Sequence, residues 1–223
     1  MQTVQEIYEQ YRIMPQLQLH QLRVAAVGKL VCESVHREIT RENIVLAGLF
    51  HDMGNIIKFD LDYFPEFVEP ERKRYWENVK KEYIEKYGTE HHTANVAIAT
   101  EIGLPQAAIE CIRTVGFAQV QSVLESESFE KKVCEYSDMR VGPHGVLPLE
   151  ERILDGRKRY LNRASKGWGL SAPIDQFSKL VELEKELEKQ IFAHARIKPE
   201  DITNEAIAGD VEKFRGYPLK VKS

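Results

Sequence analysis

The chain has 223 residues, of which 43% are hydrophobic and 30% are charged, and its formal net charge is -4 at pH 7. This composition is that of an ordinary globular protein and excludes a chain too poor in apolar residues to fold. Because the basic residues are spread along the chain, long nucleic acid is disfavoured as a partner, whereas a small phosphorylated molecule needs only a few local cations.

Helical periodicity predominates along the chain, and no convincing apolar alternation of period two accompanies it, so the sequence predicts an all-α protein. Apolar residues at helical spacing predict a short first helix over residues 4–11. A long second helix is predicted over residues 16–35, in which three valines follow His20 on one face. His20 is therefore expected to point into the core.

The third helix is predicted over residues 41–53, with Thr40 as its N-cap and with Gly48 and His51 on one side. The small residues on that side predict a close approach by a neighbouring helix. The segment 58–70 combines aromatic residues, acidic residues and two prolines, which indicates a loop that could cover a pocket.

Four further helices are predicted in the middle of the chain, over residues 71–87, 93–102, 107–123 and 129–140. A long amphipathic helix is predicted over residues 174–195, with an apolar stripe from Leu180 to Ile191. The stripe indicates packing against the core, and a homodimer seam is the alternative. One domain over residues 1–223 is expected, with its core in residues 16–140 and a C-terminal helical extension over residues 141–223.

Four side chains on these helices are candidate metal ligands. His51 and Asp52 are adjacent near a helix end, His20 faces inward on the preceding helix, and Asp138 lies on a helix far along the chain. Imidazole and carboxylate ligands without thiolate suit one divalent ion such as Mn, Fe, Co, Ni or Mg. Two histidines and two carboxylates leave positions open for water and substrate, which is typical of a catalytic site.

In this order and on helices, the four residues resemble the HD superfamily of metal-dependent phosphohydrolases. The resemblance covers roughly residues 16 to 140: HDMGN resembles the family's HD-x-G-K segment, and KYGTEHHTANVAIATEIGLP resembles its H-x-x-x-G-A region. It implies a core of about five helices and cleavage of a phosphate ester of a small molecule by a metal-activated water, with Asp52 bridging or orienting that water. Nucleotides are the favoured substrates by analogy.

Two departures from the family pattern matter. Asn55 stands where the HD-x-G-K segment has its lysine, and the nearest replacement cation is Lys58. In addition, the segment AIECIRTVG after GLP offers Arg113 but no histidine, which favours one metal ion over two.

Other residues are candidates for substrate binding and proton transfer. His91 matches the family's intermediate histidine, with His92 as the alternative, and could bind a second ion, bond the substrate or act as a general acid. Arg23, Lys58 and Arg140 are the candidate phosphate-binding cations.

Three functions remain open on the sequence alone. The first is a phosphohydrolase, either a phosphomonoesterase or a phosphodiesterase. The second is a regulatory or ligand-binding module of HD type without turnover, and the third is an iron-dependent oxygenase, for which the chain has too few histidines. The sequence has neither an apolar signal-peptide region nor a run of about 18 apolar residues. Its three cysteines are widely separated and lack the close paired spacing of zinc or redox motifs. A cytoplasmic protein with no membrane partner is therefore expected.

Overall fold

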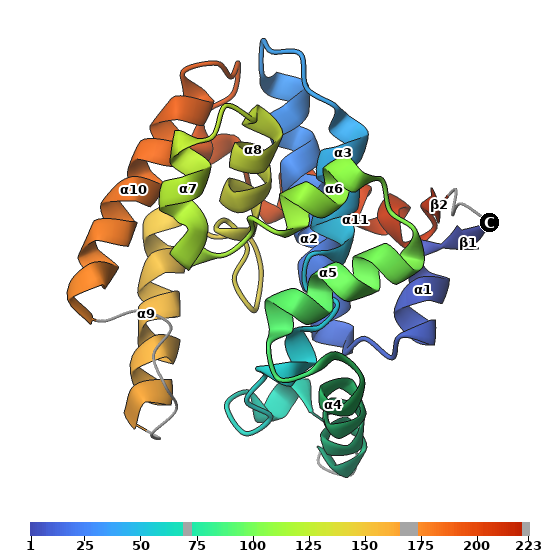
Figure 1. Ribbon diagram of the computed structural model, residues 1–223. Helices are drawn as coiled ribbons and strands as arrows, with labels where there is room; N and C mark the ends of the chain where they lie inside the picture. Colours follow the sequence, from blue (N-terminus) through green and yellow to red (C-terminus); the bar gives the residue numbers. More distant parts are fainter. Residues whose placement is uncertain (69–72, 166–173, 220–223) are drawn as a thin grey trace.

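A computed structural model describes residues 1–68, 73–165 and 174–219 of the chain. It is helical throughout except for a two-residue antiparallel pairing of β1 (Gln2–Thr3) with β2 (Pro218–Leu219), which confirms the all-α prediction (Figure 1). In the described part of the chain, no helix is both long and apolar enough to cross a membrane. The helices are α1 (Val4–Gln10), α2 (Pro15–Ser34), α3 (Arg41–Phe50), η1 (Asn55–Ile57), η2 (Pro65–Phe67), α4 (Lys73–Tyr87), α5 (His91–Ile102), α6 (Gln106–Ile112), η4 (Phe117–Gln119), α7 (Val120–Glu125), α8 (Phe129–Asp138), α9 (Leu149–Ser165), α10 (Ile174–Phe192), η5 (Pro199–Asp201) and α11 (Asn204–Arg215).

Helices α2 and α3 form the centre of the molecule, with α6, α8 and α11 packed around them (Figure 1). Gly48 on α3 allows this packing, because a Cβ atom there would lie 2.6 Å from the Cα of Ala25 on α2. The predicted close approach at the small residues of α3 is thus confirmed. Since α2 carries His20 and α3 leads into His51, this contact also sets the spacing of the candidate ligands.

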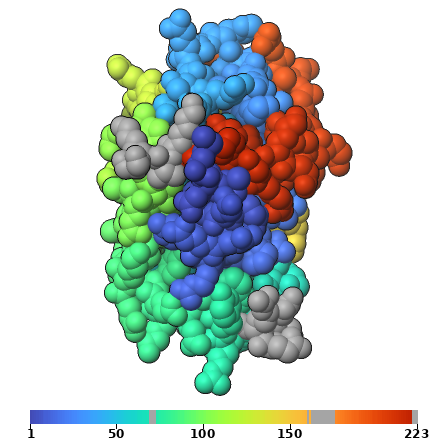
Figure 2. All heavy atoms as spheres, turned by 90° about the vertical axis from the view of Figure 1, so that its right-hand side faces the viewer, coloured from blue at the N-terminus to red at the C-terminus, as the bar shows by residue number. Residues whose placement is uncertain are grey.

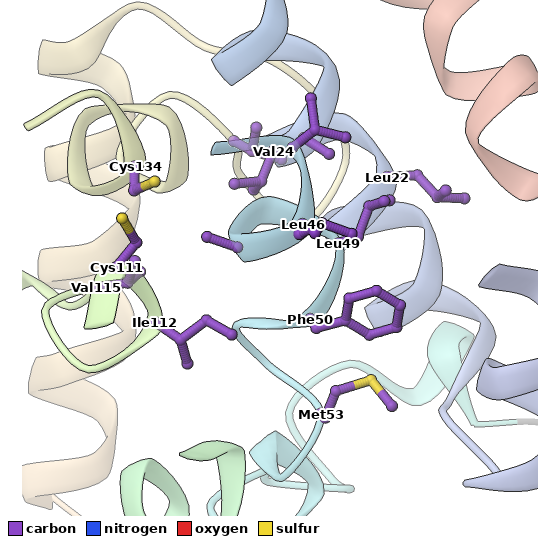
Figure 3. Packing of buried hydrophobic residues seen from close by; sticks show 14 of the residues in the cluster. Leu22, Val24, Leu46, Leu49, Phe50, Met53, Cys111, Ile112, Val115 and Cys134 are labelled. Atoms are coloured by element: carbon purple, nitrogen blue, oxygen red, sulfur yellow. The ribbon is translucent and has the colours of Figure 1, made fainter. Parts of the chain in front are cut away.

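The core between these helices consists of aliphatic, aromatic and sulfur-containing side chains. Figure 3 shows side chains of α2, α3, α6 and α8 meeting there, with the sulfur atoms of Cys111 and Cys134 turned toward each other. All three cysteines are buried and free, as their spacing predicts.

The two ends of the chain lie together. Figure 2 shows the first residues, in dark blue, against the last helix, in red. Strands β1 and β2 pair here, and α11 is tied to α2 by an ion pair of 2.7 Å between Lys29 Nζ and Asp210 Oδ2. The C-terminal extension therefore packs on the same core as the N-terminal helices. In α10, Leu187 and Ile191 are fully buried in this core, so the apolar stripe serves packing within the chain.

Several predicted boundaries differ from the structure. The helix predicted over residues 107–123 is two helices, α6 and α7, because Gly116 has φ 145° and its N–H donates to Glu135 Oε2 at 2.5 Å. Helix α3 ends at Phe50, before His51, and the side chain of Thr40 makes no capping hydrogen bond. The predicted start of α4 at residues 71–72 lies outside the described residues.

Two carboxyl groups, those of Glu135 on α8 and Glu184 on α10, are fully buried. Burial raises the pKa of Glu135 to about 7, and burial together with the neighbouring Glu135 raises the pKa of Glu184 well above its usual value. A carboxyl group whose pKa is higher in the folded than in the unfolded protein contributes stability that is fully present below the unfolded-state pKa. This contribution is lost as the pH rises through the folded-state pKa. The pair therefore makes the fold sensitive to alkaline pH.

We expect Glu184→Gln to remove part of this sensitivity, because the amide is neutral at every pH. Relative to the wild type, the variant should gain on the order of 1–3 kcal/mol of unfolding free energy at about pH 8.5 and little at about pH 5, measured by urea denaturation. Glu182→Gln is the matched control, since Glu182 is exposed on the same helix and pairs with Lys185. An equal gain at both pH values would contradict the assignment.

Candidate metal centre

The four candidate ligands come from two helices and the turn that follows α3. His20 lies on α2, His51 follows the last residue of α3, Asp52 is next in the turn, and Asp138 is the last residue of α8. The Nδ1 of His51 lies 2.9 Å from the carbonyl oxygen of Gly48, which leaves Nε2 for another partner. Because α3 ends before His51, two adjacent side chains can reach one point from different directions.

The turn after α3 is fixed by side chains from other helices. Gln21 on α2 accepts a hydrogen bond from the backbone N–H of Asp52 at 3.1 Å, and Asn95 on α5 accepts one from the N–H of Gly54 at 2.6 Å. Gly54 has no room for a side chain, since a Cβ there would lie 2.6 Å from Ala94. The HDMGN segment is thus held by α2 and α5.

The structure brings all four candidate ligands together. The Nε2 of His20 lies 3.0 Å from Asp138 Oδ1, and the Nε2 of His51 lies 3.4 Å from the same oxygen. Both Nε2 atoms lie 3.6 Å from Asp52 Oδ2. Around an ion with bonds of about 2.1 Å, donors at right angles are about 3.0 Å apart and donors in a tetrahedron about 3.4 Å apart. The spacings of 3.0 and 3.4 Å therefore fit neighbouring ligands of one divalent ion, and His20, His51 and Asp52 form a group whose ligand atoms all lie within 4.8 Å of one another.

Two further properties of the cluster suit a cation. The Nε2 atom of His51 is buried and has no hydrogen-bond partner. Burial lowers the pKa of His51, but Asp52 and Asp138 outweigh it and raise the pKa to about 9. Burial likewise raises the pKa of Asp138, but His20 and His51 bring it well below the usual range. The field of the two carboxylates thus favours positive charge at this point.

The cluster opens into a cavity of about 800 Å³. His20, Asp52 and Asp138 form part of its wall. The loop predicted to cover a pocket forms another part, through the side chains of Lys58, Phe59, Asp60, Tyr63, Phe64 and Phe67. The cavity therefore lies between the cluster and this loop.

His91 and His92 both line this cavity from the first turn of α5. Together with Glu90 they form a second group whose ligand atoms lie within 4.8 Å of one another. Burial and then the nearby Lys58 lower the pKa of His91 to about 3, so its ring is neutral at pH 7. A neutral ring can bond a substrate or bind a metal, whereas the predicted role of general acid would require a protonated ring.

The candidate phosphate-binding cations fall into two groups. Lys58 lines the cavity, but Arg23 and Arg140 do not. The prediction for Arg140 is corrected by its surroundings: the side chain is 2% exposed and its guanidinium donates to Tyr136 Oη and to the carbonyl oxygens of Leu147, Pro199 and Ile202. It anchors the C-terminal segment to α8. Burial lowers the pKa of Arg23, which is partly buried outside the cavity wall.

The sequence analysis did not identify two arginines of the cavity wall. Arg152 and Arg159 lie on α9 and line the cavity. They were missed because helix α9 was not among the predicted helices. A signal was present: Leu149 and Ile153 are at helical spacing, and the two arginines are two helical turns apart on one face.

Residues 1–116, just over half of the chain, match the family model described as HDOD domain, an HD-like helical domain. No curated protein and no solved structure matches the chain. The matched residues include His20, His51 and Asp52, whereas Asp138 and the α9 arginines lie beyond them.

Proposed function

We propose that this chain, which belongs to the HDOD domain family, is a metal-dependent phosphohydrolase that cleaves a phosphate ester of a small molecule. The observation that carries the proposal is the convergence of His20, His51, Asp52 and Asp138, at spacings of 3.0 to 3.6 Å, beside a cavity. Three of the four, His20, Asp52 and Asp138, form part of the cavity wall. A purely structural role for these groups would leave unexplained why the buried Nε2 atom of His51 makes no hydrogen bond.

A divalent ion at this point would lower the pKa of a water molecule and neutralise charge on phosphoryl oxygens. The residues of the chain would do the rest. The carboxylates of Asp52 and Asp138 would bind the ion, and Lys58 on the covering loop would place a positive charge near the phosphate. His91, neutral at pH 7, is placed in the cavity to donate a hydrogen bond to a substrate oxygen.

A regulatory module that binds a ligand without turnover is the alternative, and one observation favours it. Asn55 lies on the cavity wall where the HD-x-G-K pattern has a lysine, and its buried Oδ1 has no hydrogen-bond partner. An amide oxygen accepts hydrogen bonds, whereas a lysine ammonium at this position would donate them to a phosphate. Such a site would bind a ligand with an N–H or O–H group here.

Release of phosphate from a panel of nucleotides and other phosphate esters separates the two functions. We expect the metal-loaded wild type to hydrolyse at least one ester, and Asp52→Ala to lower its kcat/KM by about 10³-fold or more, because the metal-dependent part of catalysis amounts to several kcal/mol. Asp62→Ala is the matched control, since Asp62 lies on the covering loop and pairs with Lys73 outside the cavity. Bound metal with no turnover on any ester would overturn the hydrolase and support the regulatory module.

A further inference from the structure

Helix α9 contributes two arginines to the cavity that contains the candidate metal centre. Arg152 and Arg159 both line its wall, and they stand two helical turns apart on one face. The helix lies outside the residues that match the family model. These side chains therefore belong to the part of the chain that distinguishes it from the matched domain.

Arg152 lines the cavity and is anchored by its Nε atom. Its Nε donates to the carbonyl oxygen of Val141 at 2.8 Å, and neither Nη atom makes a hydrogen bond to a described residue. Burial and the like charge of Arg159 lower its pKa, while Asp138 and Asp52 raise it. A guanidinium without a bidentate partner, fixed at a cavity wall, is the arrangement that binds a phosphate.

Gly156 makes room for this guanidinium. It lies one turn after Arg152 on the cavity wall, and a Cβ there would come 3.2 Å from Arg152 Nη1. Glycine in a helix interior costs about 1 kcal/mol relative to alanine. A glycine at this position leaves the Nη atoms accessible to a ligand.

Arg159 is the second cation of the group. Its Nε and Nη2 donate to Asp155 Oδ2 at 3.0 and 2.8 Å, which orients the guanidinium and partly compensates its charge. Asp155 is not part of the cavity wall. Arg159 is therefore expected to contribute less to anion binding than Arg152.

We propose that Arg152 and Arg159 form a second anion subsite, and that the substrate is a phosphate ester carrying a further phosphate group or phosphate chain. This inference rests on the proposed function: the scissile phosphate lies at the metal centre, and the second anionic group lies against α9. The two arginines thus determine specificity, selecting substrates with two separated anionic groups over simple monoesters.

Binding of inorganic phosphate, pyrophosphate and tripolyphosphate, measured by calorimetry with and without Mn²⁺, tests the subsite. We expect the wild type to bind tripolyphosphate at least about tenfold more tightly than phosphate, and Arg152→Gln to lose about tenfold or more of that affinity. Its affinity for phosphate at the metal centre should fall by a smaller factor than its affinity for tripolyphosphate. Lys158→Gln, an exposed charge removal on the same helix, should change neither value.

Two further variants guard against a folding defect. Arg152→Lys keeps the charge and should retain an intermediate affinity for tripolyphosphate, while Gly156→Ala should lower that affinity by crowding Nη1. A folded Arg152→Gln protein, judged by its helical circular dichroism, that binds tripolyphosphate as tightly as the wild type would overturn the subsite and leave the hydrolase intact. Tripolyphosphate binding that depends on Arg152 in a protein without metal-dependent turnover would uphold the subsite and overturn the hydrolase.

Discussion

Asp138→Ala is expected to abolish binding of the divalent ion and to lower phosphate release by about 10³-fold or more, while the helical fold is retained. Asp138 Oδ1 lies near the Nε2 atoms of both His20 and His51, so its loss opens one side of the cluster and removes half of the carboxylate charge. The side chain is partly exposed at the cavity, which keeps the effect on the fold small. Metal content by elemental analysis, activity and circular dichroism measure the three parts of the result.

Asp210→Ala provides the control for this experiment. Asp210 also pairs with a basic group, Lys29, but it lies on α11 away from the cavity. The control should keep metal and activity. Unchanged metal content in Asp138→Ala would remove Asp138 from the site.

Gly48→Ala is expected to lower the unfolding free energy by about 1–3 kcal/mol, although alanine is the better helix former. The added Cβ would lie 2.6 Å from the Cα and 2.7 Å from the N of Ala25, which are backbone atoms that no rotamer change can move. Helices α2 and α3 would have to separate. Because these helices position His20 and His51, metal affinity should fall together with stability.

Gly209→Ala is the matched substitution in a helix without this contact. A Cβ at Gly209 on α11 would meet no atom within 4 Å, so this variant should be unchanged or stabilised by up to about 1 kcal/mol. Urea denaturation of both variants gives the comparison. Equal stabilities of the two variants would show that the packing of α2 on α3 is loose enough to accept a methyl group.

Much of the fold could be predicted because local signals agree with tertiary packing. Helix α5 ends at Gly103, with φ 80°, and α4 is followed by Gly88, with φ 84°, as the positions of these glycines predict. Pro15 starts α2 because the first turn of a helix requires no N–H donor from it. The convergence of the candidate ligands could also be predicted, since the His51-Asp52 pair and the inward face of His20 are visible in the sequence.

Other features depended on contacts that no local pattern records. The break at Gly116 is stabilised by Glu135, which lies on α8 and is buried beside it. Arg140 follows Asp138 closely in the chain, yet its guanidinium donates hydrogen bonds to the carbonyl oxygens of Pro199 and Ile202 in the C-terminal segment. The spacing of Leu149 and Ile153 could have predicted α9, but only the structure shows that this helix places Arg152 on the cavity wall.

Anomalous diffraction from crystals soaked with Mn²⁺ tests the metal centre most directly. We expect one peak within about 2.0–2.3 Å of the Nε2 atoms of His20 and His51 and of carboxylate oxygens of Asp52 and Asp138. A peak confined to the group of Glu90, His91 and His92, or no peak at all, would contradict a metal site at the HD residues and the hydrolase proposed from it.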